Sequence, residues 1–128
     1  MPLSVTPLYA SLIAIVFLIL TARVIIYRRG NRISLGDAGD KNLLKRIRAQ
    51  ANCAELAPIG VLLLLCLELQ GTPPALLHGL GLALLAGRIA HAIGFSRYPQ
   101  IMSLRVWGMA LTLAMLGISA VGLLINML

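Results

Sequence analysis

The sequence predicts an all-α membrane protein: an antiparallel four-transmembrane-helix bundle in one domain, residues 1–128. Three observations lead to this prediction. The chain is 59% hydrophobic and only 12% charged, against roughly 25% charged residues in soluble proteins. A soluble domain of this size could not bury so much apolar surface. The apolar residues form four long runs, and the cations gather beside two of the three connections between these runs.

The first run predicts a helix over about residues 5–27, which contains SLIAIVFLILTA and meets its first charge at Arg23. It is long enough to span, since a transmembrane helix needs about 20 mostly apolar residues. No basic segment precedes it and the run is too long for a signal peptide, so we expect a retained membrane span. Glycines, Asn31 and two aspartates then predict a loop over residues 28–40, in which Asp40 can cap the next helix.

The second helix, about residues 40–70, begins with the charged stretch KNLLKRIRAQANCAE and becomes apolar only after Glu55. Its clean apolar part, residues 56–67, is too short to cross about 30 Å of hydrocarbon. We therefore expect the helix to carry Asn52 and Glu55, together with Arg48, into or near the membrane. Pro58 lies inside this helix and removes one backbone donor, which predicts a kink.

The remaining chain predicts two more spans. Gly71-Thr-Pro-Pro indicates a turn, followed by a helix over about residues 74–95, a short link, and a last helix over about residues 101–127. In the third helix the first charge is Arg88, and the fourth has none after Arg105. Short connections between the four spans indicate an up-down bundle.

The basic residues indicate the orientation. The second connection and both chain ends carry no cations, so the positive-inside rule places the first and third connections in the cytoplasm and both termini outside. The net charge of +7 is thus a topology signal, and 5% aromatic residues are too few for a base-stacking surface, which excludes a nucleic-acid partner. The eleven cations that flank the first and third connections are Arg23, Arg28, Arg29, Arg32, Lys41, Lys45, Arg46, Arg48, Arg88, Arg97 and Arg105.

Three polar residues share one face of the second helix. Arg48, Asn52 and Glu55 are spaced i, i+4 and i+7, which places them within a wedge of about 60°. Ionisable groups at membrane depth are costly and usually face a bundle interior or a wet cavity. Two interpretations stay open: a buried Glu–Arg pair that holds helices together, and a site for a polar ligand.

The third helix has two distinctive faces. One consists of the small residues Ala83, Gly87, Ala90 and Gly94 and suits close helix packing in lipid. The other holds Arg88, His91 and Phe95, where His91 is either a structural histidine or a ligand contact.

The helical arginines predict an anion site. Arg105, one turn into the last helix, could simply extend to the interface. Together with Arg48 and Arg88, however, it places three guanidinium groups at one level against a single carboxylate, Glu55. This surplus of positive charge favours an anion, and the planar guanidinium suits carboxylates.

Other chemistries find no support in the sequence. No His, Cys, Asp or Glu cluster has the spacing of metal ligands, and no phosphate-binding or dinucleotide fingerprint is present. Cys53 and Cys66 lie thirteen helical residues apart, roughly 20 Å, too far for a disulfide. Cys53 near Arg48 could be a nucleophile, although a buried cysteine is more often a small hydrophobe. His78 lies near the uncharged face, and we expect it at the interface.

Two motifs carry a family resemblance. RIRAQANCAELAP (residues 46–58) and GRIAHAIGF (residues 87–95), followed by an arginine at the start of the last helix, resemble the MAPEG family of membrane-associated proteins in eicosanoid and glutathione metabolism. Order, spacing and four-helix layout agree along nearly the whole chain. The GD of the first loop and the ELQG that ends the second helix are similar to the bacterial branch, which implies a bacterial inner membrane.

The resemblance implies a homotrimer that binds glutathione between neighbouring subunits, and a transferase or peroxidase that acts on lipophilic small molecules. It implies glutathione as co-substrate and no metal. Arg105 would be catalytic by stabilising the glutathione thiolate. The residues implied to bind glutathione are Arg48, Asn52, Glu55, Arg88, His91 and, by a looser match, Arg23.

The chain departs from the family pattern at several aromatic positions. Phe95 replaces a tyrosine that several family enzymes carry, Trp107 and Met109 stand where tyrosines are common, and the only late tyrosine is Tyr98 in the third connection. These departures keep one alternative open, a glutathione- or lipid-binding membrane protein without turnover. Four helices with one embedded glutamate leave a second alternative, a small transporter built around Glu55, which the nearby Arg48 makes less favourable.

Overall fold

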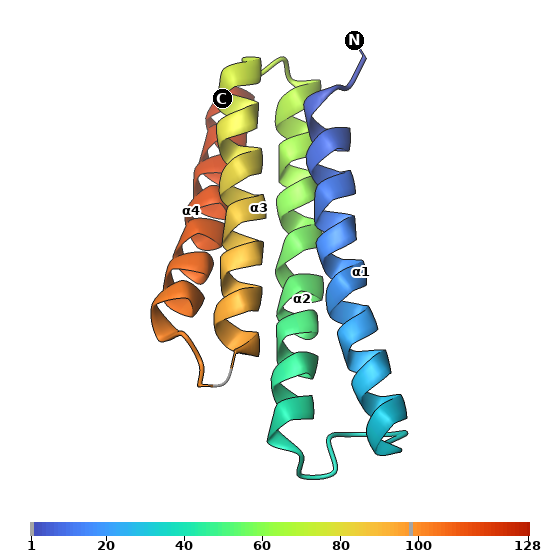
Figure 1. Cartoon of the computed structure of the whole chain (residues 1–128). Helices are drawn as coiled ribbons and strands as arrows, with labels where there is room; N and C mark the ends of the chain where they lie inside the picture. Colours follow the sequence, from blue (N-terminus) through green and yellow to red (C-terminus); the bar gives the residue numbers. More distant parts are fainter. Residues whose placement is uncertain (1, 98) are drawn as a thin grey trace.

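The computed structural model describes residues 2–97 and 99–128, so Tyr98 lies outside the described residues. It has four helices: α1 (Val5–Asn31), α2 (Lys41–Leu69), α3 (Pro74–Ser96) and α4 (Met102–Met127). All four are long and apolar enough to cross a membrane. Neighbours in sequence run antiparallel, and both termini lie at one end (Figure 1). The predicted all-α bundle of four membrane helices is therefore confirmed.

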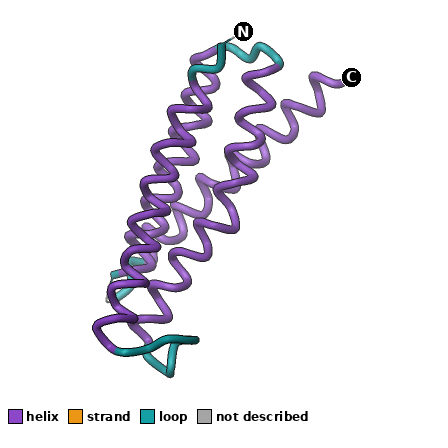
Figure 2. Tube along the Cα trace, turned by 90° about the vertical axis from the view of Figure 1, so that its right-hand side faces the viewer, coloured by secondary structure: helices purple, strands orange, loops and turns teal. Residues whose placement is uncertain are grey.

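The helices are packed around α2 and α3. These two contact each other and both outer helices, whereas α1 and α4 share no contact in the described chain. The first connection projects beyond the third (Figure 1), and α4 diverges from the other helices towards the C-terminus (Figure 2). The ends of α3 and α4 at the third connection therefore lie beside the first turns of α2 rather than level with the first connection (Figure 1).

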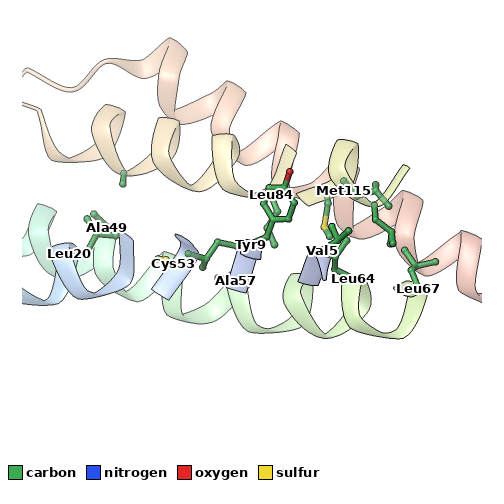
Figure 3. Close-up of a cluster of buried hydrophobic side chains, with 14 residues drawn as sticks. Val5, Tyr9, Leu20, Ala49, Cys53, Ala57, Leu64, Leu67, Leu84 and Met115 are labelled. Carbon is green, nitrogen blue, oxygen red and sulfur yellow. The ribbon is translucent and has the colours of Figure 1, made fainter. Parts of the chain in front are cut away.

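The core lies between the helices and is mainly apolar, and the buried polar side chains among the described residues are Thr6, Arg88, His91, Thr112 and Ser119. Figure 3 shows side chains from all four helices meeting there, including Tyr9, Cys53, Leu84 and Met115. Large apolar side chains also cover the outside, and Leu18, for example, is 63% exposed. An apolar exterior of this extent is stable in lipid, where backbone polar groups are satisfied inside each helix.

Glycines allow α3 and α4 to cross closely. A Cβ atom at Gly87 would lie 2.7 Å from the Thr112 hydroxyl and 2.8 Å from the Gly108 carbonyl oxygen. One at Gly94 would meet the Arg105 backbone nitrogen. These two members of the predicted small-residue face therefore bring α4 against α3, and they fix where Arg105 enters the bundle.

The first connection is held by hydrogen bonds at both ends. α1 continues to Asn31, four residues past the predicted end, because Arg28 and Arg29 suit the negative end of the helix dipole. Asp40 caps α2 as predicted: its Oδ1 accepts from the backbone N–H groups of Asn42 (2.9 Å) and Leu43 (3.2 Å). Its Oδ2 accepts from the Tyr27 hydroxyl at 2.7 Å, which ties α1 to α2.

At the opposite end, Glu68 near the end of α2 caps the start of α1. Its carboxylate accepts from the backbone N–H groups of Ser4 (3.1 Å), Val5 (2.9 Å) and Thr6 (2.8 Å). Nearby, the Tyr9 hydroxyl and His78 Nδ1 share a hydrogen bond of 2.9 Å between α1 and α3. Neither contact was predicted, since the partners are more than 60 residues apart in the sequence.

Candidate functional site: an arginine-lined pocket

A pocket of about 520 Å³ opens between α2, α3 and α4, beside the third connection. We call it the arginine pocket. It brings together residues that the sequence singled out, from three helices, while α4 supplies most of its apolar wall. Its lining consists of Arg48, Asn52, His91, Phe95, Met102, Arg105, Val106 and Met109.

Arg105 projects into the pocket from the first turn of α4. Its guanidinium lies over the Phe95 ring, 4.3 Å from the centroid, and Nη1 donates to Gln100 Oε1 at 3.2 Å. No carboxylate of the described chain forms an ion pair with it. Phe95, at the position where several family enzymes carry a tyrosine, therefore supports the arginine by a cation–π contact.

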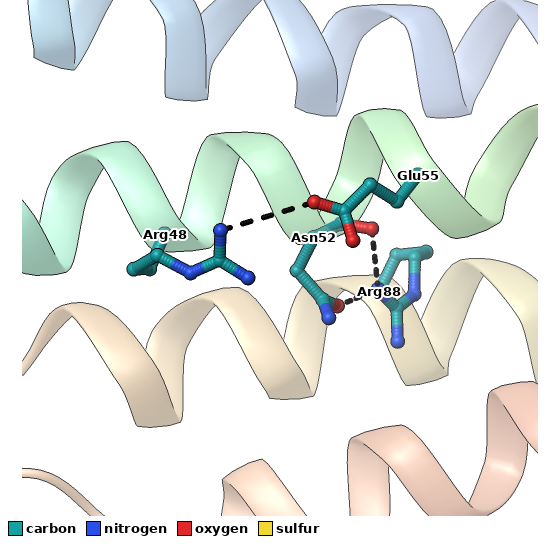
Figure 4. Close-up of polar contacts among 4 residues, drawn as sticks. All are labelled: Arg48, Asn52, Glu55 and Arg88. Carbon is teal, nitrogen blue, oxygen red and sulfur yellow. Dashed lines mark hydrogen bonds and ion pairs between the residues drawn. The ribbon is translucent and has the colours of Figure 1, made fainter.

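Arg48 and Glu55 share the predicted face of α2 and form a loose ion pair, with Nη1 and Oε1 3.8 Å apart (Figure 4). Their side chains are 48% and 60% exposed. An exposed pair contributes at most about 1 kcal/mol, and both partners lie on one helix, so the pair joins no helices in this chain. Arg48 lines the pocket, whereas Glu55 lies beside it.

Arg88 lies behind the pocket wall and is 1% exposed. Its Nη1 donates to the side-chain oxygen of Asn52 and, at 3.4 Å, to the Asn52 backbone carbonyl (Figure 4). Its Nε donates to the Thr112 hydroxyl at 3.0 Å. Arg88 therefore acts on the pocket through Asn52, which does line it. His91, also buried, lines the pocket directly and packs against Phe95.

Arg23 and Cys53 face other parts of the surface. Arg23 lines a groove of about 320 Å³ between α1 and α3, with Leu20 and Ala92. Cys53 is buried and borders an apolar groove of about 530 Å³ between α1 and α2, and it is not among the residues that line the arginine pocket. Both cysteines are free, as the helical spacing predicted. Within one chain Arg23 does not join the arginine pocket, and its contact with glutathione stays a prediction.

The pocket is suited to an anion. Its charged lining groups are two guanidinium groups, and a third lies directly behind Asn52. No group of His, Cys, Asp and Glu among the described residues could hold a metal ion. Beside apolar walls, where water screens charges poorly, guanidinium groups attract carboxylates strongly.

Sequence reasoning missed two contributions to the site. Thr112 supports Arg88, and the only available signal was a hydroxyl residue inside an otherwise apolar span, which often bonds across helices in membranes. Met102 and Val106 form the apolar wall, and they are indistinguishable in sequence from residues that face lipid. Trp107, 68% exposed, is absent from the lining, whereas Met109 is part of it.

Comparisons with known proteins agree with this architecture. The model of the MAPEG family matches residues 6–125. The chain is similar to the inner membrane protein YecN of Escherichia coli strain K12, with 34% identity over 108 residues, which is 84% of this chain and 81% of the relative. The same protein of Escherichia coli O6:H1 strain CFT073 matches equally well.

Proposed function

Because this chain belongs to the MAPEG family, which includes glutathione transferases, we propose that it is a glutathione-dependent transferase or peroxidase of a bacterial inner membrane. It would activate the glutathione thiolate for attack on lipophilic electrophiles. The observation that carries the proposal is the arginine pocket, which holds the guanidinium groups of Arg48 and Arg105 beside an apolar wall.

The charges of the pocket complement those of glutathione. This tripeptide has two carboxylates and one ammonium group. Arg48 and the Asn52 amide offer donors for a carboxylate, and Glu55, next to Arg48, offers an acceptor for the ammonium group. Arg88 adds positive potential from behind Asn52. In this proposal His91 contacts the peptide from α3.

Arg105 is the proposed catalytic residue. A thiol with a pKa of about 8.5 is mostly protonated at neutral pH, and a nearby guanidinium stabilises the thiolate, which is the nucleophile. The thiol proton passes to solvent. The thiolate sulfur then forms a bond to the electrophilic carbon, and the leaving group departs with its electron pair. In the peroxidase reaction two glutathione molecules give the disulfide while a hydroperoxide becomes an alcohol and water.

The rest of the proposal concerns the assembly. Three copies would form the active protein. The first and third connections would lie in the cytoplasm, because the cations that flank them follow the positive-inside rule. Arg23 would contact glutathione from a neighbouring subunit, since its groove between α1 and α3 shares no lining residue with the arginine pocket of its own chain. The lipophilic acceptor would reach the thiolate from the membrane along the side of Met102 and Val106.

Binding without turnover is the second candidate. Phe95 lacks the hydroxyl of the tyrosine it replaces and instead stacks on Arg105. A site that kept its arginines and lost a hydroxyl donor could still retain glutathione. This candidate predicts the same dissociation constant for glutathione as the enzyme would have, and no conjugation of glutathione to any electrophile.

The decisive test is glutathione binding by calorimetry to the purified protein in nanodiscs. Arg48→Ala should weaken binding about 10- to 100-fold, since hydrogen bonds to charged groups contribute about 1.5–3 kcal/mol. Arg97→Ala is the matched control, because this exposed arginine ends α3 at the same end of the bundle and does not line the pocket.

The outcomes separate the candidates. Wild-type binding together with conjugation of a generic aryl halide supports the enzyme, and binding without activity over a broad panel of electrophiles supports the second candidate. No binding by the wild type would contradict both. Proton-coupled flux in vesicles that Glu55→Gln abolishes would instead indicate a transporter.

A further inference from the structure

The Asn52 side chain has one end fixed by Arg88. A guanidinium has only donors, so it can bond only to the oxygen of a side-chain amide. Arg88 Nη1 donates to Asn52 Oδ1 and also to the backbone carbonyl of the same residue. Figure 4 shows this contact between α2 and α3. The amide nitrogen has no hydrogen-bond partner in the described part of the chain and remains available to the pocket.

Arg88 is in turn fixed by Thr112. Arg88 Nε donates to Thr112 Oγ1 at 3.0 Å, and the Thr112 hydroxyl donates its single hydrogen to the Gly108 carbonyl at 2.9 Å. Thr112 is fully buried. Because its hydroxyl hydrogen is used by Gly108, its oxygen is oriented as an acceptor for Arg88. The chain of contacts thus runs from α4 through α3 to α2.

The Arg88 guanidinium depends on few acceptors. No carboxylate among the described residues forms an ion pair with Arg88, and its Nη2 is buried without a partner there. Its hydrogen-bond partners are neutral oxygens, so loss of one leaves a second buried donor unpaired, which is costly. The contacts also lie where α3 and α4 pack closely, since a Cβ at Gly87 would lie 2.7 Å from the Thr112 oxygen.

We propose that Thr112 is a positioning residue of the arginine pocket. Through Arg88 it turns the Asn52 amide so that the NH₂ group faces the pocket, and the site selects a ligand that presents a carboxylate or peptide carbonyl there. This inference rests on the proposed function for the identity of the ligand, and on the described contacts alone for the orientation of the amide.

The first experiment compares Thr112→Val, Thr112→Ser and the wild type by glutathione calorimetry and steady-state kinetics. Valine keeps the shape and loses the acceptor, so we expect the Kd and the KM for glutathione to rise about tenfold, the effect of roughly 1.4 kcal/mol. Serine keeps the acceptor and should restore wild-type binding, with kcat unchanged in both. Equal binding by the valine and serine variants would overturn the proposal.

Ser119→Ala is the matched control. Ser119 lies on α4 seven residues after Thr112, is equally buried, and its hydroxyl has no partner among the described residues. Its removal should leave the Kd unchanged. A loss of binding equal to that of Thr112→Val would show that any buried hydroxyl of α4 matters, and would overturn a specific role for Thr112.

A second experiment measures the thermal unfolding of Asn52 variants, which requires no glutathione. Asn52→Asp gives Arg88 a carboxylate partner and presents an oxygen to the pocket in place of the amide donor. We expect a higher midpoint of thermal unfolding together with weaker glutathione binding than in Asn52→Ala. A lower midpoint than that of Asn52→Ala would overturn the contact chain. If the wild type binds no glutathione, the proposed function fails, and this stability arm still decides the Arg88 contact.

Discussion

The two ends of the bundle use buried and half-buried polar groups differently. At the end that holds the termini, the Glu68 carboxylate is matched by three backbone N–H groups, and Tyr9 and His78 satisfy each other. At the pocket end, Arg105 and Arg88 have only neutral oxygens or a ring as partners, and Arg48 has a loose ion pair. A carboxylate in a membrane span is therefore not in itself a sign of function, whereas unmatched donors that converge on a pocket are such a sign.

Arg105→Ala should give the largest effect and sharpen this comparison. Removal of a group that stabilises the reacting charge typically lowers kcat about 10²–10³-fold. Stability should change little, because the described contacts of the guanidinium are one hydrogen bond to Gln100 and stacking on Phe95. The measurement is conjugation of a generic electrophile beside thermal unfolding. Full activity in this variant would remove Arg105 from the mechanism.

The pocket end was more predictable from the sequence than the other end for a physical reason. Arg48 and Asn52 are one turn apart on one helix, so helical spacing alone places them on a common face. The charge pattern of the helices also singled out His91 and Arg105, which the structure brings to the same pocket, and the family motifs added only their implied roles. Glu68 and Ser4, by contrast, are partners 64 residues apart, and no local pattern encodes such a pairing. Thr112 was missed because its role depends on the α3–α4 crossing.

Gly108→Ala tests whether the pocket depends on that crossing. A Cβ at Gly108 would lie 2.6 Å from the Gly87 carbonyl oxygen and would also strike the His91 backbone. Backbone atoms cannot rotate away, so α3 and α4 must separate, at a cost of about 1–3 kcal/mol as for other overpacked cores. We expect a lower unfolding midpoint. Glutathione binding should also weaken, because His91 on α3 and Arg105 on α4 would move apart.

Gly117→Ala provides the control for that prediction. Gly117 lies on the same helix with nothing within 4 Å of an added Cβ, so alanine should raise stability by up to about 1 kcal/mol through helix propensity. A similar loss in both variants would mean that α4 tolerates no added methyl group anywhere, and the special status of the crossing would be contradicted.

Glu68→Gln tests the cap of α1 at the end of the bundle that holds both termini. The amide keeps the shape but loses the charge that favours the positive end of the α1 dipole and the three N–H donors. We expect a loss of about 1 kcal/mol, the usual effect of an N-terminal cap, seen as a lower unfolding midpoint. Glutathione binding should stay at the wild-type value. A change in binding would show that the two ends are coupled, which would contradict their separate roles.

Substitution of Asp40 should change stability least. The direction in which this contribution depends on pH follows from the hydrogen bonds of its carboxylate. The hydrogen bond from Tyr27, with those from the Leu43 and Asn42 backbone, lowers the pKa of the Asp40 carboxyl. Its contribution to stability is therefore fully present above the unfolded pKa, about 3.9, and is lost as the pH falls through the lower folded value. The amide introduced by Asp40→Asn still caps the helix but does not titrate.

The measurement is the unfolding midpoint at pH 7 and at pH 3 for the wild type, Asp40→Asn and Tyr27→Phe. Other carboxyl groups titrate in all three proteins, so only the differences between them report on Asp40. The wild type should lose more stability on acidification than Asp40→Asn. Tyr27→Phe removes the largest cause of the lowered Asp40 pKa and should fall between them. Equal losses in all three would mean that the charge of this carboxylate contributes nothing to the link between α1 and α2 at the pocket end. This end, unlike the Glu68 end, would then rely on its other contacts, such as the Gln50–Thr21 hydrogen bond and the stacking of Arg46 on the Tyr27 ring.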